Sequence, residues 1–204
     1  MDRQEYLNQI SAKNRSAKGG KPKILSSKFF WVGAIGIGAL ILIIIIGALL
    51  GGGKTSGKDQ LFSLILHINN TSELIETYQQ NVKSSDLRAS SASLYSVLTN
   101  DSKKLTEFAE EKYNFKEKDV EKSLIEEEAT AKDGLEAELF EAKINGVLDR
   151  IYAHKMAYEI SLITNREVQI MKSVNNDSLD DILTTSYNSL DNLYEKFNGF
   201  SETN

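Results

Sequence analysis

Residues Phe29–Leu50 read FFWVGAIGIGALILIIIIGALL, a run without a charged side chain that lies between Lys28 and Lys54. A helix over this run is about 33 Å long, which matches the roughly 30 Å hydrocarbon core of a bilayer. A cleaved signal peptide fits less well, because 28 residues precede the run and an ordinary signal peptide has an apolar part of only about 7–15 residues. We therefore predict one transmembrane helix that acts as an uncleaved signal anchor.

The charges differ sharply on the two sides of this run. Residues 1–28 carry seven basic and two acidic side chains, whereas residues 55–204 carry 16 basic and 27 acidic ones. Because basic segments stay in the cytoplasm, this asymmetry predicts a cytoplasmic N-terminus and an extracytoplasmic C-terminal domain. We expect residues 1–28 to be a basic disordered cytoplasmic arm, 29–50 the transmembrane helix and 51–58 a Gly-rich linker.

Residues 59–199 are predicted to form a helical bundle, with 200–204 as a tail. The one proline of the chain is Pro22, and apolar residues after residue 58 recur with a helical period. The expected helices cover about 59–82, 86–113 and 117–131 or beyond, then a long helix carrying apolar residues from Ile144 to Ile170, and a last one over 179–197. The fold class is all-α: one N-terminal transmembrane helix followed by an antiparallel bundle of four to five helices of the ferritin-like up-and-down type.

Several local features refine this expectation. Asp86 can cap the second bundle helix. The third helix is interrupted at either Gly134 or Gly146, and the sequence leaves both open. Its inward residues are expected to include Val120, Leu124 and Ile125. In the last helix the apolar side follows a four-three spacing that places one coiled-coil-like seam against its neighbours: Leu179, Leu183, Ser186, Leu190, Leu193 and Phe197.

Few residues qualify as catalytic or metal-binding candidates. The chain has no cysteine and two histidines, His67 and His154. Neither follows a glutamate by three positions, as the ligand pairs of di-iron bundles do, and we expect His154 to be a semi-buried, hydrogen-bonded histidine. Glu126 and Glu127 read as a solvated face, and Glu128 falls close to the apolar stripe. We predict no catalytic, cofactor-binding or metal-binding residue.

Two glycine patterns in and beside the apolar run resemble functional motifs. Residues 48–55, ALLGGGKT, are a relaxed form of a phosphate-binding loop. A nucleotide site is not expected, because no alternation of strands and helices follows, and the glycines read as a hinge. Ala34/Gly38 and Gly47/Gly51 have the spacing that lets transmembrane helices approach, so a homo-oligomer is possible.

The combination of a basic arm, one apolar anchor and a cysteine-free helical domain resembles small uncharacterised single-pass bacterial membrane proteins. Residues 148–152, LDRIY, and the stretch 179–197 are similar to a ferritin-like family of putative membrane or periplasmic proteins. The resemblance implies an up-and-down helical bundle. It implies no metal site, since the family's helix histidines are replaced by Leu98 and Thr99 and by residues 188–193.

These features predict a non-enzymatic, membrane-anchored extracytoplasmic bundle for protein or cell-envelope interaction. Its partners would be the lipid bilayer and other envelope proteins. Nucleic acid is not expected, because the domain is acidic. The alternatives are a sensory or small-ligand-binding bundle and, more remotely, a metal-binding ferritin-like protein.

Overall fold

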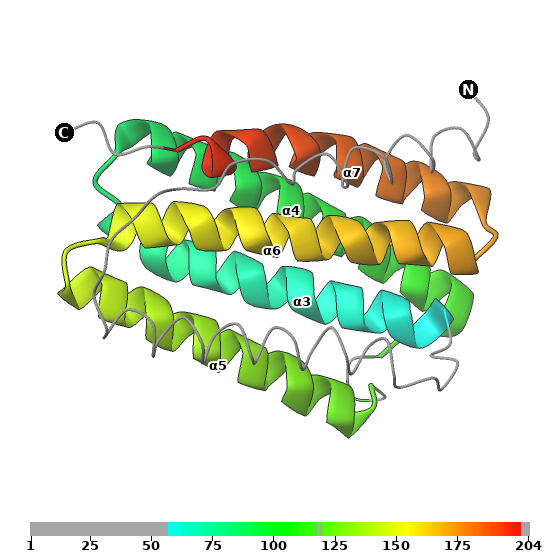
Figure 1. The fold of residues 1–204 in the computed structure, drawn as a ribbon. Helices are drawn as coiled ribbons and strands as arrows, with labels where there is room; N and C mark the ends of the chain where they lie inside the picture. The colour runs from blue at the N-terminus through cyan, green and yellow to red at the C-terminus, as the bar shows by residue number, and fades with distance from the viewer. Residues whose placement is uncertain (1–56, 117, 119, 201–204) are drawn as a thin grey trace. The chain divides into compact units, whose positions relative to one another are not determined.

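The computed structural model describes residues 57–116, 118 and 120–200, and within them the fold is all-α (Figure 1). Five α-helices follow one another with no strand among the described residues. Their bounds are α3 Gly57–Tyr78, α4 Ser85–Tyr113, α5 Lys122–Ile144, α6 Leu148–Ser173 and α7 Asp177–Asn198, with the short 3-10 turn η1 Gln79–Asn81 after α3. The prediction of a helical bundle in this part of the chain is confirmed.

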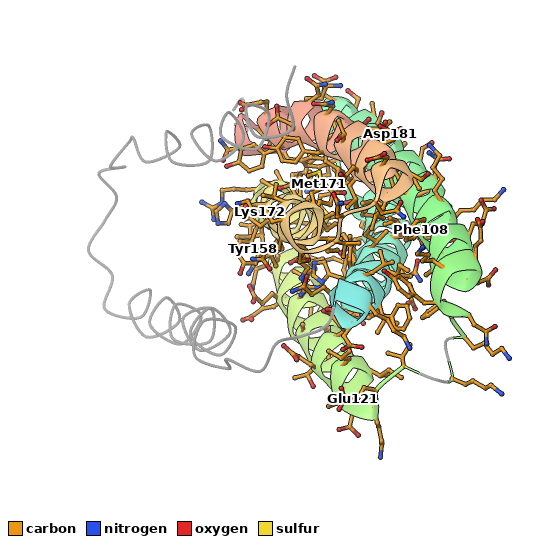
Figure 2. All side chains as sticks on the ribbon, turned by 90° about the vertical axis from the view of Figure 1, so that its right-hand side faces the viewer. Phe108, Glu121, Tyr158, Met171, Lys172 and Asp181 are labelled. Carbon is orange, nitrogen blue, oxygen red and sulfur yellow. The ribbon has the colours of Figure 1, made fainter. Side chains whose placement is uncertain are left out.

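The helices lie side by side, with α5 and α7 at opposite margins and α3 and α6 between them (Figures 1 and 2). α3, α5 and α7 run in one direction and α4 and α6 in the other. Interhelical bonds fix these directions: Ser173 at the end of α6 bonds Gln60 at the start of α3, whereas Tyr78 at the end of α3 bonds the Glu136 carbonyl in α5. Each helix therefore buries one side against a neighbour of opposite direction.

The four-three seam predicted in the last helix is the buried side of α7. All six of its residues, from Leu179 to Phe197, are buried. The apolar residues that recur with a helical period in α3 are buried as well, and so are most of those in α4, among them Leu64, Ile68 and Leu98. Regular apolar spacing identified these buried faces because each of these helices packs with one continuous stripe.

The residue that caps α4 lies two positions before the predicted one. Ser84 caps the helix, its hydroxyl accepting from the Leu87 amide, and Asp86 lies in the first turn instead. Asp149 of α6 also accepts the backbone amides of Lys83 and Ser84 at 2.9 and 2.7 Å. The segment before α4 is thereby held extended, so the helix cannot begin earlier.

The connection from α4 to α5 is longer than predicted. Asn114, with φ of 52°, ends α4 in the left-handed conformation, and α5 begins at Lys122 instead of near Glu117, which itself lies outside the described residues. Between them Phe115 is buried against Phe62, with 4.4 Å between ring centroids, and Val120 is buried. These two side chains thus belong to the core although neither residue lies in one of the two helices.

The structure decides which glycine interrupts the third helix. α5 passes through Gly134 and ends at Ile144, and the turn to α6 contains Gly146 with a φ of +71°. This conformation is costly for residues with a Cβ. Ile144 is thus the last residue of α5, where the sequence pattern had assigned it to the following helix.

The predicted inward face of α5 is wrong in part. Ile125 is 40 % exposed and Ile144 is 68 % exposed, and Leu124 is half-buried. The buried residues of α5 are instead Glu128, Leu135, Leu139 and Ala142. α5 rests on α3 and α6 through a narrow stripe, so much of its apolar content stays in solvent.

The predicted membrane segment lies outside the part of the chain that the structure describes. Among the described helices, none is long and apolar enough to span a bilayer. The arm, residues 29–50, most of the linker and the tail from residue 201 are likewise outside the described residues. The chain divides into two units, residues 1–54 and 55–204, and the bundle is described here by itself.

Candidate functional site

His67 of α3 lies between two carboxylates that come from different helices. Its Nδ1 atom is 2.9 Å from Oε2 of Glu128 on α5, in a well-directed hydrogen bond. Its Nε2 atom is 2.9 Å from Oε2 of Glu159 on α6, in a close electrostatic contact whose direction is not that of a hydrogen bond. All three side chains are buried. His67 therefore joins α3, α5 and α6 through one ring.

Arg166 completes this group, which we call the ionic cluster: His67, Glu128, Glu159 and Arg166. The Arg166 Nη1 atom is 2.6 Å from Oε1 of Glu128 and also donates to the Ser63 carbonyl oxygen at 3.3 Å. The Ser63 hydroxyl donates to the same Glu128 oxygen at 3.1 Å. Both carboxylate oxygens of Glu128 are thus occupied by donors.

The ionic cluster shifts the protonation of its members. Burial alone would raise the pKa of Glu128, but the hydrogen bond from His67 and the charge of Arg166 outweigh it and lower the pKa to about 2. Burial alone would lower the pKa of His67, but its contacts with Glu128 and Glu159 raise it above the ordinary value of 6.5. The favoured state is a charged Glu128 facing a protonated His67 and Arg166.

The geometry of the ionic cluster suits a buried network of ion pairs between helices better than a metal site. A metal needs ligand atoms that converge on one point, whereas the two carboxylates lie on opposite nitrogens of the imidazole. Arg166 takes the second oxygen of Glu128, which a cation would need. Within the described residues, no group of three histidine or carboxylate side chains could hold a metal ion. The residues present do not fit the metal centre of a ferritin-like protein.

A second polar group lies between α4, α6 and α7. Glu167 of α6 is fully buried, and the Ser186 hydroxyl of α7 donates to its Oε1 atom in a short hydrogen bond. Asp101 of α4 is also buried, and the same serine lies close enough to its carboxyl group to influence its pKa. One oxygen of each carboxyl group has no hydrogen-bond partner in the described part of the chain. We call Asp101 and Glu167 the carboxyl pair.

Burial raises the pKa of both members of the carboxyl pair. It raises the pKa of Glu167 well above the ordinary value, and the nearby Asp101 charge raises it further, while the Ser186 hydrogen bond acts the other way. Burial likewise raises the pKa of Asp101, against the influence of Ser186 and the charge of Lys104. Two carboxyl groups in one apolar site cannot both carry a charge cheaply. Glu167 is therefore the member of the pair whose protonated form burial favours most strongly.

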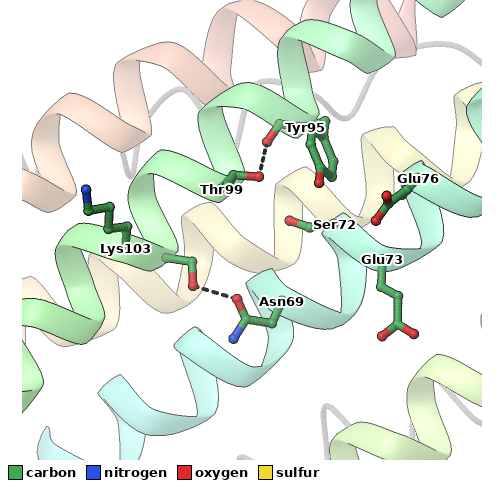
Figure 3. A pocket seen from close by; sticks show the side chains of 8 residues that line it. Asn69, Ser72, Glu73, Glu76, Tyr95, Thr99 and Lys103 are labelled. Carbon is green, nitrogen blue, oxygen red and sulfur yellow. Dashed lines mark hydrogen bonds between the residues drawn. The ribbon is translucent and has the colours of Figure 1, made fainter.

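A shallow polar groove lies on the surface between α3 and α4 (Figure 3). Its volume is about 350 Å³. Several lining groups already bond one another or nearby residues: Ser102 donates to Asn69, and Lys132 forms an ion pair with Glu73. The lining side chains are Asn69, Ser72, Glu73, Glu76, Tyr95, Thr99, Ser102 and Lys103.

The structure agrees with the sequence-based expectation for some of the candidate residues and not for others. Glu126 and Glu127 are exposed, as expected of a solvated face, and Glu128 is buried, as its position near the apolar stripe suggested. His154 is exposed, which contradicts the prediction of a semi-buried histidine. Its place on α6 faces away from the helices that cover the buried stripe. His67, which the pattern left without a role, is the centre of the ionic cluster.

The sequence analysis did not predict the other buried polar residues. For two of them, Glu159 and Glu167, the sequence nevertheless contained a signal. Glu167 lies four residues after Ile163 and three before Ile170, in the middle of the apolar stripe of α6. Glu159 lies four before Ile163 on the same stripe. A carboxylate at such a position is either buried with partners or ends the stripe. Their partners on other helices could not be found from spacing within one helix.

The chain was compared with family models, curated proteins and solved structures, and none of them matches.

Proposed function

We propose that the chain is a non-enzymatic, membrane-anchored helical bundle that presents an acidic domain outside the cytoplasm for interaction with protein or envelope partners. The observation that carries the proposal is the charge asymmetry around the apolar run at residues 29–50. Seven basic and two acidic side chains precede it, and 16 basic and 27 acidic ones follow from residue 55. This distribution favours translocation of the long acidic part.

The disposition of the bundle's buried polar groups supports an interaction role. The ionic cluster and the carboxyl pair both lie at interfaces between helices. Members of the ionic cluster contact one another, and Glu167 of the carboxyl pair accepts from Ser186. A catalytic site requires reactive groups next to a cavity that admits a substrate. The groove between α3 and α4 is lined by other residues than these. The buried polar groups thus serve packing between helices.

The groove favours a second candidate function, the binding of a small polar ligand. Glu76 and the Tyr95 ring line it together, and a carboxylate beside an aromatic ring suits a small amine. A panel of small amines is expected to raise the melting temperature of the wild-type bundle and not that of Glu76→Gln. An equal rise in both proteins would count against the groove as the site.

Cysteine labelling tests the proposed topology directly, because the natural chain has no cysteine. Two single-cysteine variants suffice: Ser16→Cys in the basic arm and Ser93→Cys on the exposed side of α4. In cells whose outer envelope is permeabilised, a maleimide that cannot cross the inner membrane is expected to label Ser93→Cys. Ser16→Cys should react only after the membrane is lysed.

Two outcomes of this experiment oppose the proposal. Labelling of Ser16→Cys in unlysed cells, with protection of Ser93→Cys, would invert the topology. Equal labelling of both positions in a fraction that does not sediment with membranes would remove the anchor. The proposed interaction role then needs partners: in vivo cross-linking from surface positions of the bundle should yield discrete envelope proteins.

A further inference from the structure

The largest exposed apolar side chains of the described residues all lie on α5. Phe140 is 56 % exposed and Ile144 is 68 % exposed, and Ile125 at the other end of the helix is 40 % exposed. Phe140 and Ile144 are four residues apart, so they adjoin on the helix surface. Ala137, also exposed, precedes Phe140 by three on the same side. We call Ala137, Phe140 and Ile144 the α5 ridge.

The α5 ridge is exposed because a different side of α5 packs against the bundle. Leu135, Leu139 and Ala142 form the narrow stripe that packs on the bundle, and Phe140 projects about 100° from its neighbour Leu139. Scattered exposed apolar residues need no explanation. Two large ones that adjoin on an edge helix are more informative. α5 lies at the margin of the bundle (Figure 1), and the side chains of the α5 ridge are exposed.

Acidic side chains flank the α5 ridge. Glu136 and Glu141 lie on either side of it, and Asp133 extends its line by one turn toward the start of α5; all three are exposed. Other acids of α5 are already paired: Glu126 with Lys122, Glu138 with Lys155, and Glu128 within the ionic cluster. In the described part of the chain no ion pair neutralises Asp133, Glu136 or Glu141. Lys143 is the basic side chain beside them.

We propose that the α5 ridge binds an amphipathic helix whose apolar side chains are flanked by Lys or Arg. Such a helix would lay its apolar side on Phe140 and Ile144 while its basic residues meet Glu136 and Glu141. The inference deepens the proposed function and rests on it, because it names the surface and the chemistry of a partner. The acidic flank opposes docking on anionic lipid.

A second copy of the chain fits this surface less well. A stable interface buries about 800 Å² on each partner, and the α5 ridge offers little more than two large side chains. Residues 55–204 also carry a net charge of -11, which disfavours approach of the same acidic surface. A short basic segment of another protein meets both limits.

A peptide-binding assay on the full chain in nanodiscs of zwitterionic lipid tests the proposal. The probe is a labelled amphipathic helix of about 18 residues with leucine on one side and lysine on the flanks, and its matched control carries glutamate in place of lysine. Binding is followed by fluorescence anisotropy, and binding to empty discs is subtracted. The variant is Phe140→Ser with Ile144→Ser, and Ile125→Ser is the control at the other end of α5.

The lysine peptide is expected to bind the wild type, with affinity reduced at least about tenfold in the double variant and about twofold or less in Ile125→Ser. The glutamate peptide should not bind. Circular dichroism verifies that each variant is folded. Equal binding by wild type and double variant, equal binding of both peptides, or binding to empty discs alone would overturn the proposal. The discs present the bundle in either orientation, so this result is independent of the cysteine-labelling test.

Discussion

At the scale of single residues, Glu128 is the carboxylate on which the ionic cluster depends. It accepts from His67, Arg166 and Ser63. Glu128→Gln leaves the shape but removes the charge, so His67 and Arg166 lose their closest carboxylate. We expect a loss of about 3 kcal/mol in the free energy of unfolding near neutral pH. Urea unfolding followed by circular dichroism measures it.

The pH dependence of this loss has a definite sign. The folded pKa of Glu128, about 2, lies below its ordinary value of 4.5. Its stabilising contribution is therefore present above about pH 4.5 and disappears as the pH falls toward about 2. Glu127→Gln, one residue away and exposed, is the matched control and should change stability by less than about 0.5 kcal/mol. Equal losses in the two variants would refute the role given to the ionic cluster.

Glu167 is expected to show the opposite pH dependence. Its folded pKa lies well above the ordinary value of 4.5, so its contribution is fully present below that value and is lost as the pH rises through the folded pKa. Glu167→Gln mimics the protonated form and keeps an acceptor for Ser186. Between about pH 5 and about pH 8, we expect the variant to lose less stability than the wild type.

The comparison for this second prediction is Glu195→Gln on the exposed side of α7. Its pH profile should follow that of the wild type, which isolates the burial of Glu167 as the cause. If Glu167→Gln and the wild type lose the same stability over this range, the carboxyl of Glu167 is already ionised in the folded protein.

At the scale of elements, the contrast between α7 and α5 shows what the sequence could predict. Every residue of the α7 seam is buried, because a single continuous stripe faces the neighbouring helices. α5 has apolar residues all around, and its buried stripe includes Glu128 while Phe140 and Ile144 stay outside. Periodicity alone cannot select the buried side when a charged residue on it is paired by groups from other helices.

Alanine substitutions at Gly134, within α5, and at Gly146, just after it, are predicted to change stability in opposite directions. A Cβ added at Gly134 meets no atom within 4 Å, and the residue is exposed inside the helix. Gly134→Ala should stabilise the bundle by about 0.8 kcal/mol. At Gly146, with φ of +71°, alanine should destabilise it by about 1 kcal/mol. Thermal unfolding of both variants measures the two effects, and a destabilising Gly134→Ala would mean that α5 is interrupted there.

At the scale of the whole molecule, the spacing of apolar residues predicted the all-α class of the described residues, but it could not predict the polar core. His67, Glu128 and Glu159 are brought together from positions 61 and 31 residues apart. Their meeting depends on how α5 lies across α3 and α6, which follows from the long connection after Asn114 and the turn at Gly146. Such placement is a property of the assembled bundle.

This assembly distributes stability unevenly. α5 buries four of its 23 residues, whereas α6 buries 13 of its 26. Segments with few buried contacts open at lower free energy than the rest of a domain. Hydrogen exchange measured by mass spectrometry is therefore expected to show that the amides of residues 122–144 exchange well before those of α6 and α7. Peptides from the two ends of α5 should open together.

The ionic cluster makes this prediction specific, because Glu128 is the buried charged residue of α5 that contacts both α3 and α6. Glu128→Gln should accelerate exchange in α5 far more than in α7, which has no member of the ionic cluster. Glu127→Gln should leave both unchanged. Identical protection of α5 and α6 at all urea concentrations would instead mean that the five helices unfold as one cooperative unit, in which case α5 is held as firmly as the central helices despite its smaller buried stripe.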